Sequence, residues 1–237
     1  MSKKIAVVIP IYNEERFIGD VLTRLLKYPE IDIILVNDGS TDQTLEVLKS
    51  FPQIHLRQHP QNQGKGAALQ TAFHFACEQG YSAVVTMDGD GQHDPIEIPK
   101  FFQFQEEMEN LFLIGNRMQE KKSMPLVRWI TNVTMSGIVS WLAHAQISDS
   151  QCGYRRIGRN ILNQIHLTTS RFDTESEILI QSCRLGFPVR EVPIETIYGT
   201  ETSKIRVISD TIRFIFLVLR YLIKPIPYTT KKIEGVL

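Results

Sequence analysis

The sequence is poor in cysteine and has no excess of either charge. Its 237 residues include three cysteines, an odd number without metal-ligand spacing: Cys77, Cys152 and Cys183. This pattern argues against a disulfide framework and indicates ordinary thiols in a reducing, cytoplasmic compartment. The 26 basic residues equal the 26 acidic ones, so no overall field favours nucleic acid as a partner.

Long apolar runs are also scarce. The N-terminal run from Ile5 to Ile9 stops at Pro10, so we expect a first strand there rather than a signal peptide. The segment 126–145 has the length of a membrane span but carries Arg128, Asn132 and several hydroxyl groups, which argues against one. The 43% of apolar residues instead fits a globular core in water.

Short β-rich runs alternate with helical patterns in the first half of the chain. We predict strands at 5–9, 31–36, 54–57 and 83–87, and helices at 18–26, 42–48 and 64–79. This order predicts an α/β fold with a doubly wound, mostly parallel sheet flanked by helices. The second half is less regular: strands are expected at 111–114 and 189–196, helices at 125–145, 174–185 and 205–223, and a loop for SDSQCGYRR (148–156).

Polar clusters follow three of the predicted strands. YNEE comes after the first strand, NDGS after the second and DGDGQHD after the fourth. The carboxyl ends of parallel strands meet at one edge of a sheet, where such folds bind their ligands. The clusters therefore predict a nucleotide site at this edge.

The DxD motif Asp88-Gly89-Asp90 is the clearest candidate for metal chemistry. The flanking glycines let the backbone turn tightly, so that Asp88 and Asp90 present carboxylates to one ion, with Gln92 as a further ligand. Oxygen ligands suit Mg²⁺ or Mn²⁺, which commonly share their coordination with substrate phosphates. His93 and Asp94 are weaker candidates. The alternative is an acidic turn that caps a helix beginning at Pro95.

The ordered set of motifs resembles a known family. VVIPIYNEE, VNDGSTD, GKGAAL and DGDGQHDP, followed by GNR, DSQCGYR, FDTESEIL and EVPIETIYGTETSK, are similar to the inverting family 2 glycosyltransferases with the GT-A fold. The similarity is greatest to the dolichyl-phosphate (polyprenyl-phosphate) mannose synthase branch and its bacterial relatives. It implies one domain over 1–237, with a nucleotide-sugar half (1–116), an acceptor half (117–204) and an amphipathic C-terminal helix and tail (205–237).

The resemblance also implies residue roles on the donor side. It assigns Pro10, Tyr12, Glu14, Val36, Asp38, Asp88, Gly89 and Lys204 to the donor nucleotide-sugar. Tyr12 and Glu14 have alternative roles, as a packed turn aromatic and as a first-turn carboxylate favoured by the helix dipole. A direct donor contact by Lys65 is left open. Tyr198 stands where the mannose synthases have an arginine, so the donor is open between UDP- and GDP-linked hexoses.

The acceptor side is predicted to bind an anion. Arg117, Arg128 and Arg155 are candidate clamps for an acceptor phosphate, although each would also suit a surface ion pair. A polyprenyl or dolichyl phosphate is already an anion and needs no general base, so Asp90 and Arg117 are expected to carry the catalysis. A hydroxyl acceptor would need a carboxylate base. The candidates are Asp149, Asp173 and Glu175, whose alternative roles are helix capping and loop support.

The C-terminal helix suggests where the protein works. Arg206, Arg213 and Arg220 recur every seven residues and so lie along one face of a largely apolar helix. Such a helix fits a membrane surface, at the inner face for a cytoplasmic enzyme, or docks on its own domain. Two alternatives to lipid-phosphate glycosyl transfer remain: a glycosyltransferase with a hydroxyl acceptor in cell-surface glycan synthesis, and a non-catalytic or nucleotidyl-transferring α/β protein. The sequence leaves the oligomeric state open.

Overall fold

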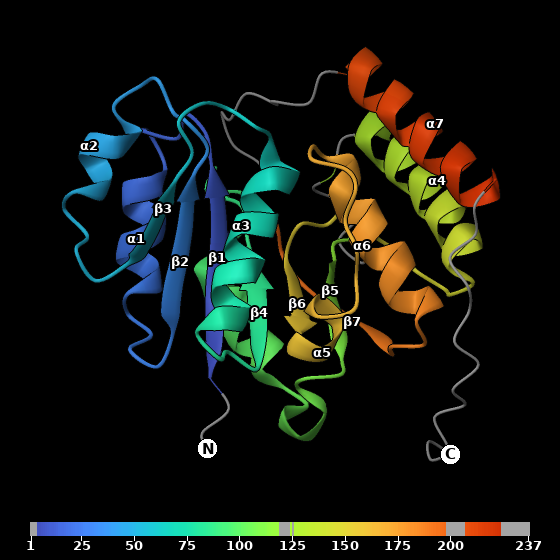
Figure 1. The fold of residues 1–237 in the computed structure, drawn as a ribbon, viewed down its shortest axis with the longest axis horizontal. Coiled ribbons are helices and arrows are strands. Elements are labelled where there is room, and N and C mark those ends of the chain that lie inside the picture. Colours follow the sequence, from blue (N-terminus) through green and yellow to red (C-terminus); the bar gives the residue numbers. More distant parts are fainter. Residues whose placement is uncertain (1–3, 119–123, 125, 198–206, 224–237) are drawn as a thin grey trace.

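A seven-stranded sheet forms the centre of the molecule, with the strand order β3-β2-β1-β4-β6-β5-β7 (Figure 1). The computed structural model describes residues 4–118, 124, 126–197 and 207–223. The strands are β1 (Ile5–Ile11), β2 (Asp32–Asn37), β3 (His55–Gln58), β4 (Ala83–Thr86), β5 (Phe112–Asn116), β6 (Arg155–Gly158) and β7 (Val189–Pro193). The first four strands lie together on one side of the sheet, and they meet the last three where β4 pairs with β6.

Helices flank this sheet. They are α1 (Ile18–Leu25), α2 (Thr44–Leu48), α3 (Lys65–Glu78), α4 (Leu126–Ala143), α5 (Arg159–Leu162), α6 (Asp173–Arg184) and α7 (Val207–Ile223). Two 3₁₀ segments, η1 (Pro95–Phe102) and η2 (Gln105–Glu107), follow the acidic loop after β4. The predicted doubly wound, mostly parallel α/β sheet is therefore confirmed.

The first four strands are parallel, and the central one, β1, is an apolar run. β1 lies between β2 and β4 and is buried at every position except Pro10. A strand covered on both faces needs apolar residues throughout, which is the pattern seen in its sequence. Because all polar residues are excluded from the strand, they gather in the loop that follows it.

The prediction of a loop for SDSQCGYRR was wrong at its end. Residues Arg155–Gly158 form β6, which is antiparallel to both β4 and β5. Arg155 and Arg156 are the largest fully buried side chains, and each guanidinium donates to backbone carbonyl groups, Arg156 to those of Phe101 and Gln103. Two arginines in a central strand contradict the apolar pattern by which buried strands are recognised, so the pattern pointed to a loop.

Three helices of the second half pack together at one end of the molecule (Figure 1). α6 contacts α3, α4 and α7. α7 buries Phe214, Leu217 and Tyr221, so this helix docks on its own domain, which was one of its two predicted roles. Within the described part of the chain, no helix has both the length and the apolar character needed to cross a bilayer.

Two helical glycines differ sharply in their surroundings and predict opposite effects of alanine. A Cβ on Gly66 in α3 would lie 1.9 Å from the Thr174 hydroxyl oxygen, so Gly66→Ala is expected to destabilise the fold by about 1–3 kcal/mol. A Cβ on Gly137 in α4 would meet nothing within 4 Å, so Gly137→Ala is expected to stabilise by about 0.5–1 kcal/mol. Urea denaturation measures the free energy of unfolding of both variants. Equal changes in this free energy would contradict the close approach of α3 to α6.

Candidate active site

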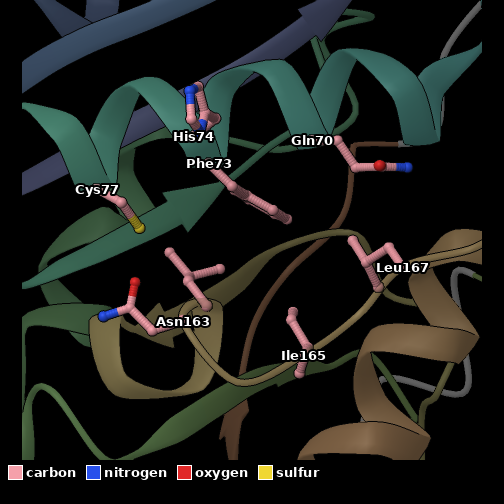
Figure 2. Close-up of a pocket in the computed structure, with 8 residues that line it drawn as sticks. Gln70, Phe73, His74, Cys77, Asn163, Ile165 and Leu167 are labelled. Carbon is pink, nitrogen blue, oxygen red and sulfur yellow. The ribbon is translucent and has the colours of Figure 1, made fainter.

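A cavity of about 1400 Å³ opens at the carboxyl ends of β1, β2 and β4. The loops that follow these strands form one wall, and α4, α6 and α7 contribute the other. A second, smaller cavity of about 240 Å³ lies between α3 and residues 162–167 (Figure 2). Its lining contains no carboxylate, lysine or arginine, whereas carboxylates, arginines and Lys65 line the larger cavity.

The loops after β1 and β2 are joined by hydrogen bonds. The Asn13 backbone N–H donates to the Ser40 hydroxyl (2.9 Å), and the Thr41 N–H donates to the Asn13 side chain (2.8 Å). The Glu14 N–H donates to the Thr44 hydroxyl at 2.8 Å. Asn13 has a φ of 54°, a left-handed conformation that asparagine tolerates better than most residues. YNEE and NDGSTD therefore form one cross-linked surface.

Asp38 anchors the next loop. Its carboxylate accepts hydrogen bonds from the backbone N–H groups of Gln63 (2.9 Å) and Gly64 (2.7 Å) and from His59 Nδ1 (2.6 Å). Asp38 is 2% exposed, yet it lines the cavity. Of the other predicted donor residues, Pro10, Tyr12 and Glu14 also line the cavity, whereas Val36 is fully buried in β2.

Lys65 bridges two acidic groups from separate parts of the chain. Its Nζ lies 2.5 Å from Asp88 Oδ1 and 3.2 Å from Glu175 Oε1. Burial alone would lower the pKa of Lys65, but the charges of both carboxylates outweigh burial and raise it. Burial would likewise raise the pKa of Asp88, but Lys65 lowers it to about 2. The three groups form a charged cluster on the cavity wall.

The surroundings of Asp90 stabilise its charged form less than those of Asp88 do. Burial, followed by the neighbouring charge of Asp88, raises the pKa of its carboxyl group. The Gln92 side chain donates to Asp90 Oδ2 at 2.9 Å and the Gln92 backbone N–H donates to Oδ1 at 3.0 Å. Asp88, Gly89, Asp90 and Gln92 all line the cavity. Two neighbouring carboxylates with only partial compensation are a donor set that a divalent cation suits.

The weaker metal candidates are engaged elsewhere. His93 Nδ1 accepts the Asp88 backbone N–H at 2.9 Å, and its ring stacks on Tyr154. Asp94 caps η1 and pairs with Arg24. Among the described residues, no group of three or more His, Cys, Asp or Glu side chains is placed to hold a metal alone. Asp88 and Asp90 by themselves supply only part of the oxygen ligands that Mg²⁺ or Mn²⁺ takes.

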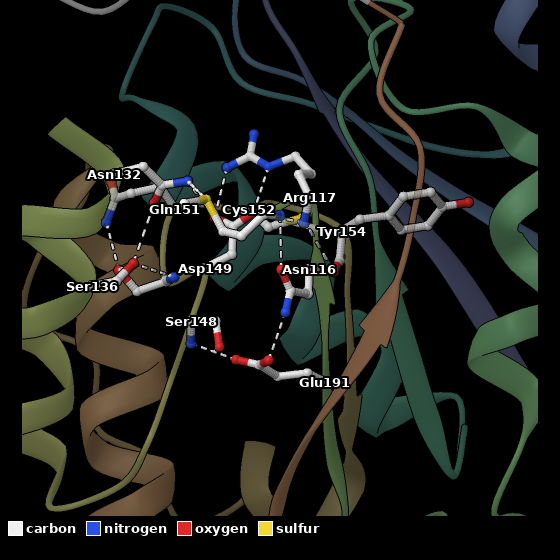
Figure 3. Close-up of polar contacts among 12 residues, drawn as sticks. Asn116, Arg117, Asn132, Ser136, Ser148, Asp149, Gln151, Cys152, Tyr154 and Glu191 are labelled. Atoms are coloured by element: carbon white, nitrogen blue, oxygen red, sulfur yellow. Dashed lines mark hydrogen bonds and ion pairs between the residues drawn. The ribbon is translucent and has the colours of Figure 1, made fainter. Parts of the chain in front are cut away.

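Arg117, at the end of β5, is held by a buried carboxylate (Figure 3). Its Nε donates to Asp149 Oδ2 at 2.7 Å and its Nη2 donates to Oδ1 at 2.8 Å, while Asn132 Nδ2 donates to Oδ1 at 2.8 Å. Burial alone would raise the pKa of Asp149, but Arg117 and Asn132 outweigh burial and lower it. Asp149 is fully buried, whereas Arg117 lines the cavity.

The other predicted acceptor and base residues differ in whether they line the cavity. Arg128, Asp173 and Glu175 line the cavity. Arg155 does not, because it is 1% exposed and its guanidinium donates to the carbonyl groups of Cys152, Ser150 and Glu175. Lys204 lies outside the described residues.

The cavity also contains polar residues that sequence reasoning did not select. Arg171 lies beside Asn62, to which it donates at 3.1 Å, and Asn132 faces the cavity from α4. Arg171 immediately precedes the FDTESEIL motif, which was a usable signal. Asn132 had only its polarity within an apolar helix.

The sheet and the helices around it have the GT-A fold of solved glycosyltransferases. Glucosyl-3-phosphoglycerate synthase from Mycobacterium tuberculosis, solved with Mn²⁺, uridine diphosphate and phosphoglyceric acid, superimposes with a TM-score of 0.70 and 17% identity, covering 94% of this chain and 78% of that one. TarS from S. aureus, solved with UDP-GlcNAc, gives a TM-score of 0.61 and 19% identity over 95% of this chain and 68% of that one. These similarities concern the fold.

Sequence comparison identifies the family. The Glycosyl transferase family 2 model matches residues 6–172. A UDP-N-acetylglucosamine–dolichyl-phosphate N-acetylglucosaminyltransferase from Methanococcus voltae is 34% identical, over 86% of this chain and 90% of that protein. The polyprenol monophosphomannose synthase of Mycolicibacterium smegmatis is 28% identical, over 81% and 77%. The chain belongs to glycosyl transferase family 2 and is a glycosyltransferase.

The Arg117–Asp149 pair predicts a pH-dependent stability. A carboxylate whose pKa is lowered by folding stabilises the protein above the unfolded pKa of about 4 and loses this contribution as the pH falls through the folded value. Asp149→Asn leaves Arg117 without its counter-ion, which is expected to cost about 3 kcal/mol at pH 7. Urea denaturation should show that the difference in the free energy of unfolding between Asp149→Asn and wild type becomes smaller below pH 4. A difference that does not change with pH would contradict the ion pair.

Proposed function

We propose that this enzyme transfers a hexose, with inversion, from a UDP- or GDP-linked donor to a polyprenyl or dolichyl phosphate in a metal-dependent reaction. The observation that carries the proposal is the division of charge in one cavity. Asp88 and Asp90 lie at the end of β4, and Arg117 and Arg128 lie at the end of β5 and on α4. A cation-bound diphosphate suits the first group, and a phosphate acceptor suits the second.

On the donor side, Asp88 and Asp90, with Gln92 beside them, would hold Mg²⁺ or Mn²⁺. The ion would neutralise the charge that grows on the leaving nucleoside diphosphate. Pro10, Tyr12, Glu14 and Asp38 form the wall for the nucleoside. Their cross-linked loops fix this wall before the donor arrives, which favours correct placement of the anomeric carbon.

On the acceptor side, the engaged carboxylates favour a nucleophile that needs no base. Asp149 is committed to Arg117, and Glu175 is committed to Lys65. A phosphate monoester is already ionised near neutral pH, so Arg117 and Arg128 need only hold it in line with the sugar. The names of the relatives from M. voltae and M. smegmatis, which specify dolichyl phosphate and a polyprenol monophosphate product, support this acceptor class.

A hydroxyl acceptor is the second candidate, and Asp173 is the observation that favours it. Asp173 lines the cavity, and burial raises the pKa of its carboxyl group, as suits a general base. Loss of transfer to a glycan hydroxyl in Asp173→Asn, with polyprenyl phosphate inactive as an acceptor, would favour this alternative.

We also propose that the enzyme works at a membrane surface. α4 and α7 expose large apolar side chains: Leu126, Val127, Ile130, Val133, Trp141, Ile212, Ile215, Phe216, Leu219, Leu222 and Ile223. Val127 is also part of the cavity wall, beside Arg128. The apolar surface is thus continuous with the place proposed for the acceptor phosphate, as a lipid-linked acceptor requires.

Two variants separate the donor and acceptor sides. Asp90→Ala is expected to lower transfer at least about a hundredfold, because charge on the leaving group is no longer neutralised. Calorimetry with UDP and GDP plus Mn²⁺ should show lost nucleotide binding.

Arg117→Ala is expected to leave nucleotide affinity unchanged and to raise the KM for undecaprenyl phosphate about tenfold or more. If Asp90→Ala keeps its activity in the presence of a chelator, the metal role is refuted. If Arg117→Ala loses as much donor affinity as Asp90→Ala, the acceptor role of Arg117 is refuted.

The membrane proposal is tested by a matched pair of charge substitutions. Phe216 on α7 and Ile96 in η1 are each 66% exposed, so a glutamate at either position should be tolerated by the fold. Phe216→Glu is expected to reduce co-sedimentation with vesicles of phosphatidylglycerol and phosphatidylethanolamine several-fold, because a charge opposes burial among lipids. Ile96→Glu should leave co-sedimentation unchanged. Equal behaviour of the two variants would remove α7 from the contact surface.

A further inference from the structure

The inner face of α4 carries a polar residue at every fourth position. Asn132, Ser136 and Ser140 are spaced so that they share one side of the helix, and all three contact the segment 147–150. Asn132 Nδ2 donates to Asp149 Oδ1 at 2.8 Å. The Ser136 hydroxyl accepts the Ser150 backbone N–H at 2.8 Å, and the Ser140 hydroxyl accepts the Ile147 N–H at 3.1 Å. We refer to these three residues as the polar ladder.

The first residue of the polar ladder differs from the others in what it reaches. Ser136 and Ser140 accept from the backbone of the segment, whereas Asn132 contacts the carboxylate that holds Arg117 (Figure 3). Asp149 Oδ2 accepts from the Arg117 backbone N–H (3.1 Å) and from Nε (2.7 Å), and Oδ1 accepts from Arg117 Nη2. Asn132 thus fixes the oxygen that completes the two-pronged contact.

The environment of Asn132 makes this contact specific. Asn132 is 4% exposed, and its side-chain oxygen accepts from the Ser136 hydroxyl at 3.2 Å, which sets the orientation of the amide. In a buried site, a two-pronged contact holds the guanidinium plane, and losing the Asn132 donor leaves Asp149 Oδ1 less firmly held, with Arg117 Nη2 still donating to it. The orientation of Arg117 is therefore coupled to the position of α4.

We propose that Asn132 is a positioning residue for Arg117 and acts through Asp149. It does not need to touch substrate. Because Arg117 and Arg128 line the same cavity and Arg128 is on α4, one helix sets the relative placement of both guanidinium groups. The consequence for the acceptor rests on the function proposed above for Arg117, whereas the geometric coupling does not.

The coupling is measured directly by NMR of arginine side chains labelled with ¹⁵N, with the Arg117 Nε signal assigned from Arg117→Lys. Asn132→Leu removes the hydrogen bonds of the amide to Asp149, Ser136 and Met118 at similar volume, and we expect it to accelerate hydrogen exchange at Arg117 Nε about tenfold. Ser140→Ala is the matched control, because it removes the two hydrogen bonds that join the same helix to Ile147 without touching Asp149. It should leave this exchange within about twofold of wild type.

Binding of farnesyl phosphate, measured by calorimetry in every variant, tests the consequence for the acceptor. Asn132→Leu is expected to weaken this binding about tenfold, and Arg117→Ala in the Asn132→Leu background should add little, because the two residues act as a unit. Affinity for UDP or GDP with Mn²⁺ should be unchanged. If Asn132→Leu does not fold, Ser136→Ala, which withdraws the support of the Asn132 amide, should accelerate exchange in the same direction.

The outcomes separate the two proposals. Unchanged exchange at Arg117 Nε in the folded Asn132 variant, or equal acceleration in Ser140→Ala, overturns the positioning role. Accelerated exchange in Asn132→Leu alone, together with unaltered farnesyl phosphate affinity in both Asn132→Leu and Arg117→Ala, supports the positioning role and overturns the assignment of Arg117 to the acceptor.

Discussion

Parallel strands that are buried on both faces can place charge only where they end, and this constraint organises the whole molecule. β1, β2 and β4 are buried along nearly all of their length, and polar side chains occur in β2 and β4 only at strand ends, so the carboxylates, the amides and Lys65 of the cavity are concentrated at one edge. Such a concentration is unstable unless the charges compensate one another. The contact of Lys65 with Asp88 and Glu175 provides that compensation, and it draws α3 and α6 to the same point.

In the second half of the chain, Arg117 follows β5, and its guanidinium is held at the cavity by Asp149. The neighbouring strand β6 carries two buried arginines that donate to backbone carbonyl groups. The bonds from Arg155 to the carbonyl groups of Ser150 and Cys152 fix the segment that precedes β6, beside Asp149. Arg117 is oriented by the Asp149 carboxylate and, through Asp149, by Asn132 on α4.

The sequence predicted the parts of this structure whose signals are local. Apolar runs such as Ile5–Ile9 predicted the parallel strands, and the acidic residues after β4 predicted a cluster that does line the cavity. It did not predict β6, because Arg155 and Arg156 are polar residues in a buried strand. Nor did it predict the pairing of Arg117 with Asp149, which are 32 positions apart and meet only after the sheet has formed. The role of Lys65 was left open, because its two acidic partners, Asp88 and Glu175, lie in distant segments that composition and spacing do not connect.

The hydrogen bonds between the loops after β1 and β2 have a kinetic consequence. Asn13, Ser40 and Thr41 are joined by backbone and side-chain contacts made by the protein's own groups. If the proposed donor site is correct, a nucleoside meets loops that hold one another in place, so its capture requires no folding of these loops. The rate at which donor is captured should then follow its concentration and the solvent viscosity, as for an encounter between two rigid bodies.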